Sequence, residues 1–426
     1  MNTPDSAGLP AMAQQARDLN RAGRTAEAAL LWKRVLAVDP NHTESLLSLS
    51  IQALARREPN VALEMLRHAA TSAPRDPMVQ IYMAAAFKEL GQLDEEMAAV
   101  TRALTIEPYF YPALLHKGML LERLGKRRQA ARVFKDLLKI MPDAERAGPG
   151  MKQAAAHAEA VVLENRQALE RHLEGVLADL RRKHAGARLD RFEETVHLMT
   201  GTKKRYAPEP VMLYFAQLPP LQFYPNELFP WIPELEAATE EIRRECEAVI
   251  VDAQDEFVPY IQKPAGEPVN QWKELNYSPR WTTYFLWKHG ERVEANCEKC
   301  PRTAQLVGSL PLAYARNFSP NVVFSALQAR TAIPPHNGDT NVRLIVHLPL
   351  ILPPRCTFRV GNDTRDWRYG KAWVFDDSVE HEARNDSDQV RVQLMLDVWN
   401  PYLTAAEREL VTELLIGVRT FYAAEG

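Results

Sequence analysis

Two histidines of this chain have the residue context of metal ligands. His336 lies in the stretch PPHNGDTN, and His381 follows further along in VEHEARND. A His-x-Asp or His-x-Glu followed by a second histidine would form a three-ligand iron site, with positions left open for substrates. Gly338 stands where that acid would be. The residues leave two interpretations open: a metal site that lacks one ligand, or a histidine in a turn.

The region that contains both histidines has the pattern of a β-sheet domain. After Trp281, short apolar and polar alternations are separated by Gly, Pro, Asn and Asp; they are RWTTYFLW, VVFSALQA, VRLIVHLPL, CTFRV, KAWVFDD and VRVQLMLDVW. Evenly spaced short strands of this kind predict a sandwich or barrel. A double-stranded β-helix, or jelly roll, is the candidate fold.

The period of two in these strands groups charged side chains. It puts Arg343 and His347 on one face of one strand, and Arg391 and Asp397 on one face of another. Charged side chains that point into an interior need a charged ligand to offset their desolvation. A dicarboxylate is the expected ligand.

The first third of the chain has an internal repeat. Prolines recur every 34 residues, and glycines precede three of them by 17 residues; the positions are Pro40, Pro74, Pro108 and Pro142, with Gly23, Gly91 and Gly125. This is the period of tetratricopeptide repeats, in which each unit is a helix, a tight turn and a second helix. Arg57 replaces the glycine of the second unit. Alanines at Ala28, Ala62 and Ala130 share one register, which Glu96 interrupts.

The repeats predict a stacked α-solenoid over residues 8–145 with a concave groove, because one unit cannot bury its apolar face alone. Such a groove is expected to hold a peptide or protein substrate. The alternative is an array that serves only as a dimer surface or spacer. Residues 146–202 are predicted to be a helical linker of one or two helices, and residues 203–426 the β-rich domain.

The composition argues against several other classes of protein. The net charge of -3 and the absence of a basic tract argue against nucleic acid as the main partner. The longest apolar stretch is short and interrupted by prolines, so we expect no membrane span and a cytoplasmic chain. Four cysteines fit a reducing compartment; Cys297 and Cys300 have redox-pair or half-zinc-site spacing, but no second pair accompanies them.

An ordered series of motifs resembles a known family. FSALQARTAIPPHNGDTNVRLIVHLPL, CTFRVGN, GKAWVFDDSVEHEARND and VRVQLMLDVWNPYLT, preceded by LPPLQFYPNELFPWIPELE, resemble the aspartyl/asparaginyl β-hydroxylase family over roughly residues 215–412. That family contains iron(II) and 2-oxoglutarate dependent dioxygenases, some of which also carry a tetratricopeptide-like domain. Its members bind iron with two histidines, a glycine taking the usual acid position.

The resemblance implies roles for individual residues. It implies that His336 and His381 bind Fe(II), and that Arg391 pairs with the distal carboxylate of 2-oxoglutarate. It further implies that Ser325, His347 and Trp281 line the cosubstrate site, and that Arg343 holds a substrate carboxylate or assists the cosubstrate; some members have another arginine where this chain has Ile345.

The resemblance implies hydroxylation of a C–H bond with O2 as oxidant, most simply the β-carbon of an Asp or Asn residue in a bound peptide. Three alternatives stay open. The site could halogenate instead, because a missing carboxylate leaves room for a halide. The substrate could be a small molecule or lipid, or the chain could be a repeat-based binding protein with an inactive oxygenase domain.

Overall fold

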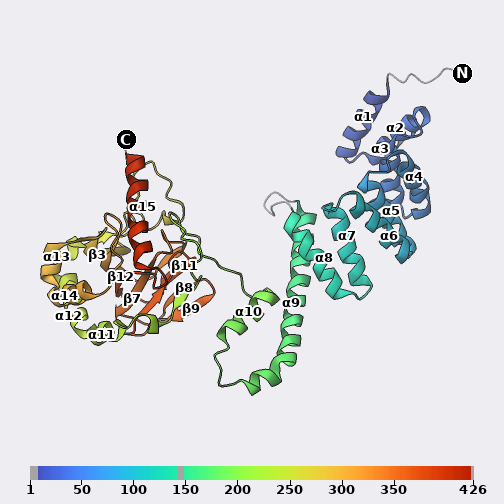
Figure 1. Cartoon of the computed structure of the whole chain (residues 1–426). Coiled ribbons are helices and arrows are strands. Elements are labelled where there is room, and N and C mark those ends of the chain that lie inside the picture. The colour runs from blue at the N-terminus through green and yellow to red at the C-terminus, as the bar shows by residue number, and fades with distance from the viewer. Residues whose placement is uncertain (1–7, 142–147, 424–426) are drawn as a thin grey trace. The chain divides into compact units, whose positions relative to one another are not determined.

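The computed structural model describes residues 8–141 and 148–423, and the chain divides into two compact units, Met1–Thr202 and Lys203–Gly426 (Figure 1). The first unit is entirely helical in its described residues. The second is built around two antiparallel β-sheets.

Helix pairs of the predicted repeat length build the first unit. Over residues 8–141 they are α1 (Leu9–Arg21) with α2 (Thr25–Val38), α3 (Thr43–Ala55) with α4 (Pro59–Ser72), α5 (Pro77–Leu90) with α6 (Leu93–Ile106), and α7 (Tyr111–Arg123) with α8 (Arg127–Ile140). The predicted helical-repeat architecture is confirmed. Pro142, the last proline of the series, lies outside the described residues.

The turn inside each pair needs a left-handed backbone. Gly23, Gly91 and Gly125 have φ of 75°, 71° and 70°, and Arg57 adopts the same conformation with φ of 59°. Glycine takes this conformation without steric cost, whereas a residue with a Cβ is strained there. The second repeat therefore keeps its turn geometry despite the substitution.

Glu96 replaces the small residue of the third repeat but is paired. Its side chain is fully buried and contacts His116 Nε2 at 2.6 Å and Arg123 Nη2 at 2.5 Å, both from α7. A buried carboxylate without such partners would be strongly destabilising. The pair of contacts ties α6 to the next repeat.

The predicted helical linker consists of two helices, α9 (Pro149–Lys183) and α10 (Asp190–Thr200). They pack against each other, with an ion pair between Arg181 and Glu193. Gly201 ends α10 in the left-handed conformation that favours glycine at a helix C-terminus.

The second unit pairs its strands in two sheets. The larger sheet has the order β1 (Phe223–Tyr224), β10 (Trp373–Phe375), β7 (Arg343–Ile351), β12 (Arg391–Trp399), β5 (Val322–Leu327), β3 (Trp281–Lys288) and β2 (Val258–Pro259), with β4 (Glu291–Arg292) paired to β3. The smaller has the order β6 (Thr331–His336), β11 (His381–Asn385), β8 (Cys356–Val360) and β9 (Asp363–Asp366).

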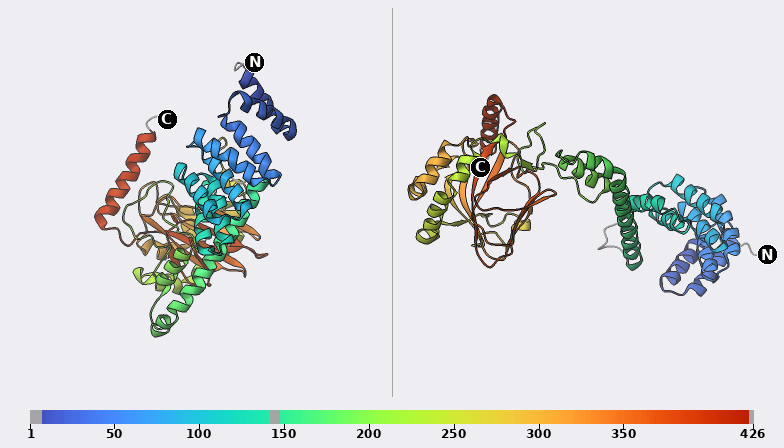
Figure 2. Two further views of the ribbon diagram at one scale, coloured as in Figure 1. Left: turned by 90° about the vertical axis from the view of Figure 1, so that its right-hand side faces the viewer. Right: turned by 90° about the horizontal axis from the view of Figure 1, so that it is seen from below.

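Alternation along the strands decides which side chains face the interior. On β7, Leu344, Val346 and Leu348 pack against helix α12, whereas Ile345 points to Phe358 of the smaller sheet. Figures 1 and 2 show four helices of this unit gathered on one side of the sheets, with α15 (Ala405–Ala423) standing apart from them; the four are α11 (Ile232–Ala237), α12 (Thr239–Asp252), α13 (Glu294–Lys299) and α14 (Pro301–Ser309). The charged face of the large sheet is therefore turned toward the small sheet.

Three features differ from or complete the sequence prediction. His336 is the last residue of a strand rather than part of a turn, although Pro334 and Pro335 precede it. Strand β6 lies at the edge of its sheet, where a missing N–H group breaks no ladder bond. Strands β9 and β11 were not predicted. A capping box begins α15 (Ala405–Ala423), in which Thr404 and Glu407 exchange hydrogen bonds.

Candidate active site between the two sheets

The two candidate ligand histidines lie side by side. His336 ends β6 and His381 begins β11, and the antiparallel register of these strands makes the two residues direct partners. Their ring centroids are 4.0 Å apart. Two histidines that are far apart in the sequence thus converge at one end of the small sheet.

Each ring is oriented by its own backbone. Nδ1 of His336 lies 2.8 Å from the carbonyl oxygen of Pro334, and Nδ1 of His381 lies 3.1 Å from that of Val379. A carbonyl oxygen only accepts, so each Nδ1–H donates and each Nε2 keeps its lone pair. Burial lowers the pKa of His336, and burial together with the neighbouring His336 holds the pKa of His381 well below its usual value. Both rings are therefore neutral and can act as metal ligands.

The space beside Gly338 is filled by another residue. A Cβ at position 338 would overlap the carboxyl group of Asp377, and Gly338 N donates to the Asp377 carbonyl oxygen at 2.6 Å. A side-chain carboxylate at position 338 would require Asp377 to move. Glycine at the acid position therefore leaves room for the Asp377 side chain.

A buried cation lies in the same cavity. Arg391 is 1% exposed, and its Nε and Nη1 have no hydrogen-bond partner among the described residues. Burial lowers the pKa of its guanidinium to about 10, which still leaves it charged at neutral pH. Both ring nitrogens of His347 are likewise unpartnered among the described residues, and burial and the nearby Arg391 lower the pKa of His347. Unpaired buried groups of this kind mark a ligand site.

Neighbouring strands bring the remaining predicted cosubstrate residues to this cavity, whose volume is about 320 Å³. Strand β5 carries Ser325 between β3 and β12, and the indole Nε1 of Trp281 donates to Ser325 Oγ at 3.1 Å. Tyr260 stacks on Trp281 with ring centroids 4.0 Å apart. The structure therefore gathers Trp281, Ser325, His347 and Arg391 at one wall.

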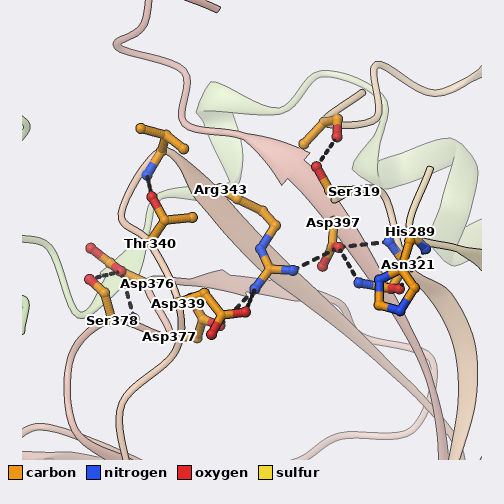
Figure 3. Close-up of polar contacts among 12 residues, drawn as sticks. His289, Ser319, Asn321, Asp339, Thr340, Arg343, Asp376, Asp377, Ser378 and Asp397 are labelled. Atoms are coloured by element: carbon orange, nitrogen blue, oxygen red, sulfur yellow. Dashed lines mark hydrogen bonds and ion pairs between the residues drawn. The ribbon is translucent and has the colours of Figure 1, made fainter. Parts of the chain in front are cut away.

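Arg343 is also in the cavity, but carboxylates surround it. Its Nη1 donates to Asp397 at 3.0 Å and its Nη2 to Asp377 at 3.3 Å, and Asp339 lies 3.9 Å away (Figure 3). Burial opposes the charge on Arg343, but these three carboxylates outweigh it and raise its pKa. Arg343 therefore has fewer free donors for a bound carboxylate than Arg391 has.

The other acidic residues near His381 are held elsewhere. Glu380 and Glu382 both pair with Arg359, and Asp376 accepts hydrogen bonds from the backbone and hydroxyl of Ser378. Among the described residues, no group of three or more His, Cys, Asp or Glu side chains is arranged to hold a metal ion.

Two neighbours of the histidines carried no recognisable sequence signal. Trp272 contacts His336 edge-on, with ring centroids 4.8 Å apart. It ends the 3₁₀ helix η4 (Asn270–Trp272), which is too short for a periodic pattern to point to it. Lys263 lines the cavity, and the side chain of Asn276 hydrogen-bonds its backbone N–H and carbonyl at 2.7 and 3.2 Å.

The cysteines are outside this site. All four are buried free thiols, and burial raises the pKa of Cys300 to about 12. A buried thiol with a raised pKa is a poor nucleophile and a poor redox partner. Cys297 and Cys300 therefore act as packing residues. No helix in the described part of the chain is both long and apolar enough to cross a bilayer.

Comparisons with known proteins fit this arrangement. The family model described as aspartyl/asparaginyl β-hydroxylase matches residues 236–401, which include both histidines and Arg391. Aspartate β-hydroxylase domain-containing protein 2 of Homo sapiens is 40% identical over 143 residues, which are 32% of this chain and 38% of that protein. Across the first curated relatives, the chain covers between 24% and 54% of their length.

Two further similarities concern different parts of the chain. A thermophilic TPR protein of Thermus thermophilus is 20% identical, with 46% of this chain and 97% of that chain covered and a TM-score of 0.32. This TM-score is too low to support an argument, so the assignment of the repeats rests on the helix pairs described above. The ornithine lipid ester-linked acyl 2-hydroxylase of Rhizobium tropici is 33% identical over 202 residues, which are 46% of this chain and 67% of that protein. With two thirds of a relative matched at this identity and the motif residues gathered in one cavity, the chain belongs to the aspartyl/asparaginyl β-hydroxylase family.

Proposed function

We propose that this protein is an Fe(II)- and 2-oxoglutarate-dependent dioxygenase that hydroxylates a C–H bond. The observation that carries the proposal is the pair His336 and His381, with free Nε2 atoms, in the same cavity as the unpartnered cation Arg391. A metal that accepts nitrogen ligands and an anion are the two ligands that this combination fits.

The histidine pair fits iron on chemical grounds. Neutral imidazoles with Nε2 lone pairs are common ligands of Fe(II), and the backbone hydrogen bonds at Nδ1 hold the rings in orientation. When bound, Fe(II) would activate dioxygen with the help of the keto acid and deliver one oxygen atom to the substrate. In the overall reaction, 2-oxoglutarate loses carbon dioxide and becomes succinate. One atom of dioxygen enters the new hydroxyl group and the other enters the new carboxylate of succinate.

Arg391 fits the distal carboxylate of 2-oxoglutarate. Its Nε and Nη1 are free to donate to a carboxylate, and the charge-assisted hydrogen bonds would offset the desolvation of a buried guanidinium. The Ser325 hydroxyl, which accepts from Trp281, and the free nitrogens of His347 are further cosubstrate contacts in this proposal. The stacked rings of Trp281 and Tyr260 would exclude water from the cosubstrate.

The strand order supports a jelly roll as the fold of this domain. Strands β5 to β12 pass between the two sheets at every step except β8 to β9, with β5, β7, β10 and β12 in the larger and β6, β8, β9 and β11 in the smaller. This pattern is that of a double-stranded β-helix. It also explains why His336 and His381 from the smaller sheet and Arg391 from the larger sheet meet in one interior.

Asp377 favours hydroxylation over halogenation. The halogenase alternative needs a vacant space for a halide where the missing carboxylate would have been. The carboxyl group of Asp377 occupies the space into which a side chain at position 338 would extend. Product mass with and without chloride distinguishes the two outcomes, and incorporation of chlorine would contradict this inference.

The first candidate substrate is a peptide, hydroxylated at the β-carbon of an Asp or Asn residue and held by the helical repeats in the cytoplasm. The family name and the groove expected of stacked helix pairs support it. The second candidate is an acyl lipid, which the name of the matched Rhizobium tropici relative favours.

Anaerobic addition of Fe(II) and 2-oxoglutarate to the full chain tests the chemistry. We expect a metal-to-ligand charge-transfer absorption band, followed by succinate release on admission of oxygen. An inactive, repeat-based binding protein would give neither signal.

A further inference from the structure

The segment 203–215 forms one side of the cavity entrance. The backbone N–H of Val211 donates to the carbonyl oxygen of Gly338 at 2.9 Å, and Met212 N donates to that of Asp339 at 3.0 Å. The segment is thus fixed to the loop that follows His336. Val211 itself lines the cavity.

Large apolar and aromatic side chains of this segment point to solvent. Val211 is 76% exposed, Met212 49% and Tyr214 56%. Tyr260, which lines the cavity, is 38% exposed, and Tyr277, whose N–H donates to the carbonyl oxygen of the lining residue Ile261 at 2.9 Å, is 58% exposed. Single exposed apolar residues are ordinary, but a group of them around an opening marks an interaction surface. We call these five residues the entrance rim.

Basic residues accompany the entrance rim. Lys203, Lys204 and Arg205 begin the same segment, and Lys263 lines the cavity where Asn276 fixes its backbone. In the described part of the chain none of the four pairs with a carboxylate, and the Lys204 ammonium lies over the Tyr206 ring at 4.9 Å. Glu209 is the one acidic residue of residues 203–215. Residues 203–215 therefore carry an excess of positive charge beside the apolar side chains of the rim, and the exposed carboxylate of Asp339, in the loop that this segment contacts, offsets part of it.

We propose that the entrance rim docks on an anionic membrane surface and presents an acyl lipid to the cavity. Apolar and tyrosine side chains enter the boundary between headgroups and acyl chains, and lysines and arginines near it attract anionic phosphates. Charge complementarity and continuity with the cavity select this occupant over a second copy of the chain. The lipid as substrate rests on the proposed hydroxylase function, whereas the docking does not.

Vesicle sedimentation of the full chain tests the docking. The chain sediments with vesicles of phosphatidylglycerol and phosphatidylcholine, binds pure phosphatidylcholine vesicles less, and is released by added salt. The triple variant Val211→Ser, Met212→Ser, Tyr214→Ser lowers the partition coefficient by about tenfold or more, since it removes buried apolar area. Lys204→Gln with Lys263→Gln lowers it by about fivefold for each charge.

A matched control removes exposed apolar side chains elsewhere in the second unit. Val251→Ser with Tyr314→Ser changes residues that are 78% and 50% exposed and leaves sedimentation unchanged. Circular dichroism checks that every variant is folded. The docking proposal is overturned if the wild-type chain ignores phosphatidylglycerol vesicles, if the rim and control variants behave alike, or if light scattering shows a dimer that the rim variant abolishes.

Two further measurements separate docking from chemistry. Vesicles should raise the rate of succinate release, and lipids extracted afterwards should gain the mass of one oxygen atom. If only Asp- or Asn-containing peptides stimulate succinate release, the lipid half of the proposal is wrong. A charge-transfer band without vesicle binding refutes the docking and leaves the hydroxylase standing, whereas vesicle binding without the band refutes the hydroxylase.

Discussion

Buried charge is treated differently in the two units of this molecule. In the helical unit, the buried carboxylate of Glu96 has two partners within 2.6 Å, the guanidinium of Arg123 and the imidazole of His116. In the β-sheet unit, Arg391 and His347 are also buried, yet Nε and Nη1 of Arg391 and both ring nitrogens of His347 lack hydrogen-bond partners among the described residues. A buried charged side chain with partners indicates a structural contact between repeats, and one without partners indicates a ligand-binding site.

Removal of a candidate iron ligand should have the largest effect. His336→Ala or His381→Ala should lower the rate of succinate release by more than about 100-fold, since loss of groups that only support ligands already costs roughly 10- to 100-fold. The charge-transfer band with Fe(II) and 2-oxoglutarate should disappear. The matched control is His116→Ala, a histidine of the helical unit, which should keep the band. A band that survives loss of either ligand would contradict the site assignment.

Replacement of the unpartnered cation should separate binding from stability. Arg391→Met should weaken 2-oxoglutarate binding by about 100-fold, because two charge-assisted hydrogen bonds are lost. The free energy of unfolding without cosubstrate should stay equal or rise, because an unpaired buried charge is removed. Titration calorimetry and chemical denaturation measure the two effects. A strongly destabilised variant would mean that Arg391 has a structural partner.

Replacement of the paired carboxylate Glu96 should lower stability, in contrast to replacement of Arg391. Glu96→Ala should reduce the stability of the helical unit by about 2 to 4 kcal/mol, because Arg123 and His116 lose their partner. Adding Arg123→Leu should restore part of the lost stability, because it removes the cation that Glu96→Ala leaves without its partner. The alanine itself suits this position, because the other repeats already carry alanine at this register. Glu95→Ala, an exposed neighbour, is the control. Equal stability of the Glu96 and Glu95 variants would remove the contrast between the units.

The smallest effect is a pH dependence of the helical unit. Burial lowers the pKa of His116 below its ordinary value of 6.5, although its bond to Glu96 opposes this. The unfolded state therefore binds more protons as the pH falls below 6.5, and the free energy of unfolding drops by at most about 1.4 kcal/mol per pH unit. Denaturation of wild type and His116→Gln at several pH values measures this. A steeper acid loss in the variant would reverse the sign.

Local sequence patterns predicted the helix pairs and the faces of the strands correctly. The 34-residue period and the turn glycines predicted the helix pairs because each repeat depends on contacts between neighbours in the chain. Arg57 shows the limit of the pattern: the turn kept its left-handed conformation without glycine. The alternation in VRLIVHL and VRVQLMLDVW predicted which side chains share a face, since that period is a property of any strand.

Long-range contacts were not predictable in the same way. The position of His336 in a strand depended on β6 being an edge strand, which only the sheet order reveals. The three carboxylates around Arg343 come from β12 and from two loops, so no local spacing indicates them. Asp377 lies beside Gly338 for the same reason.

The sequence by itself determined the repeat length, the faces of the strands and the identity of the residues that we propose hold a metal and an anion. Only the tertiary structure decided that two histidines become register partners, that Asp377 fills the gap at Gly338, and that Arg391 is left unpaired while Arg343 is not. The physical reason is that pairing, burial and charge compensation depend on which strands lie next to one another, and that is a property of the folded sheets as a whole.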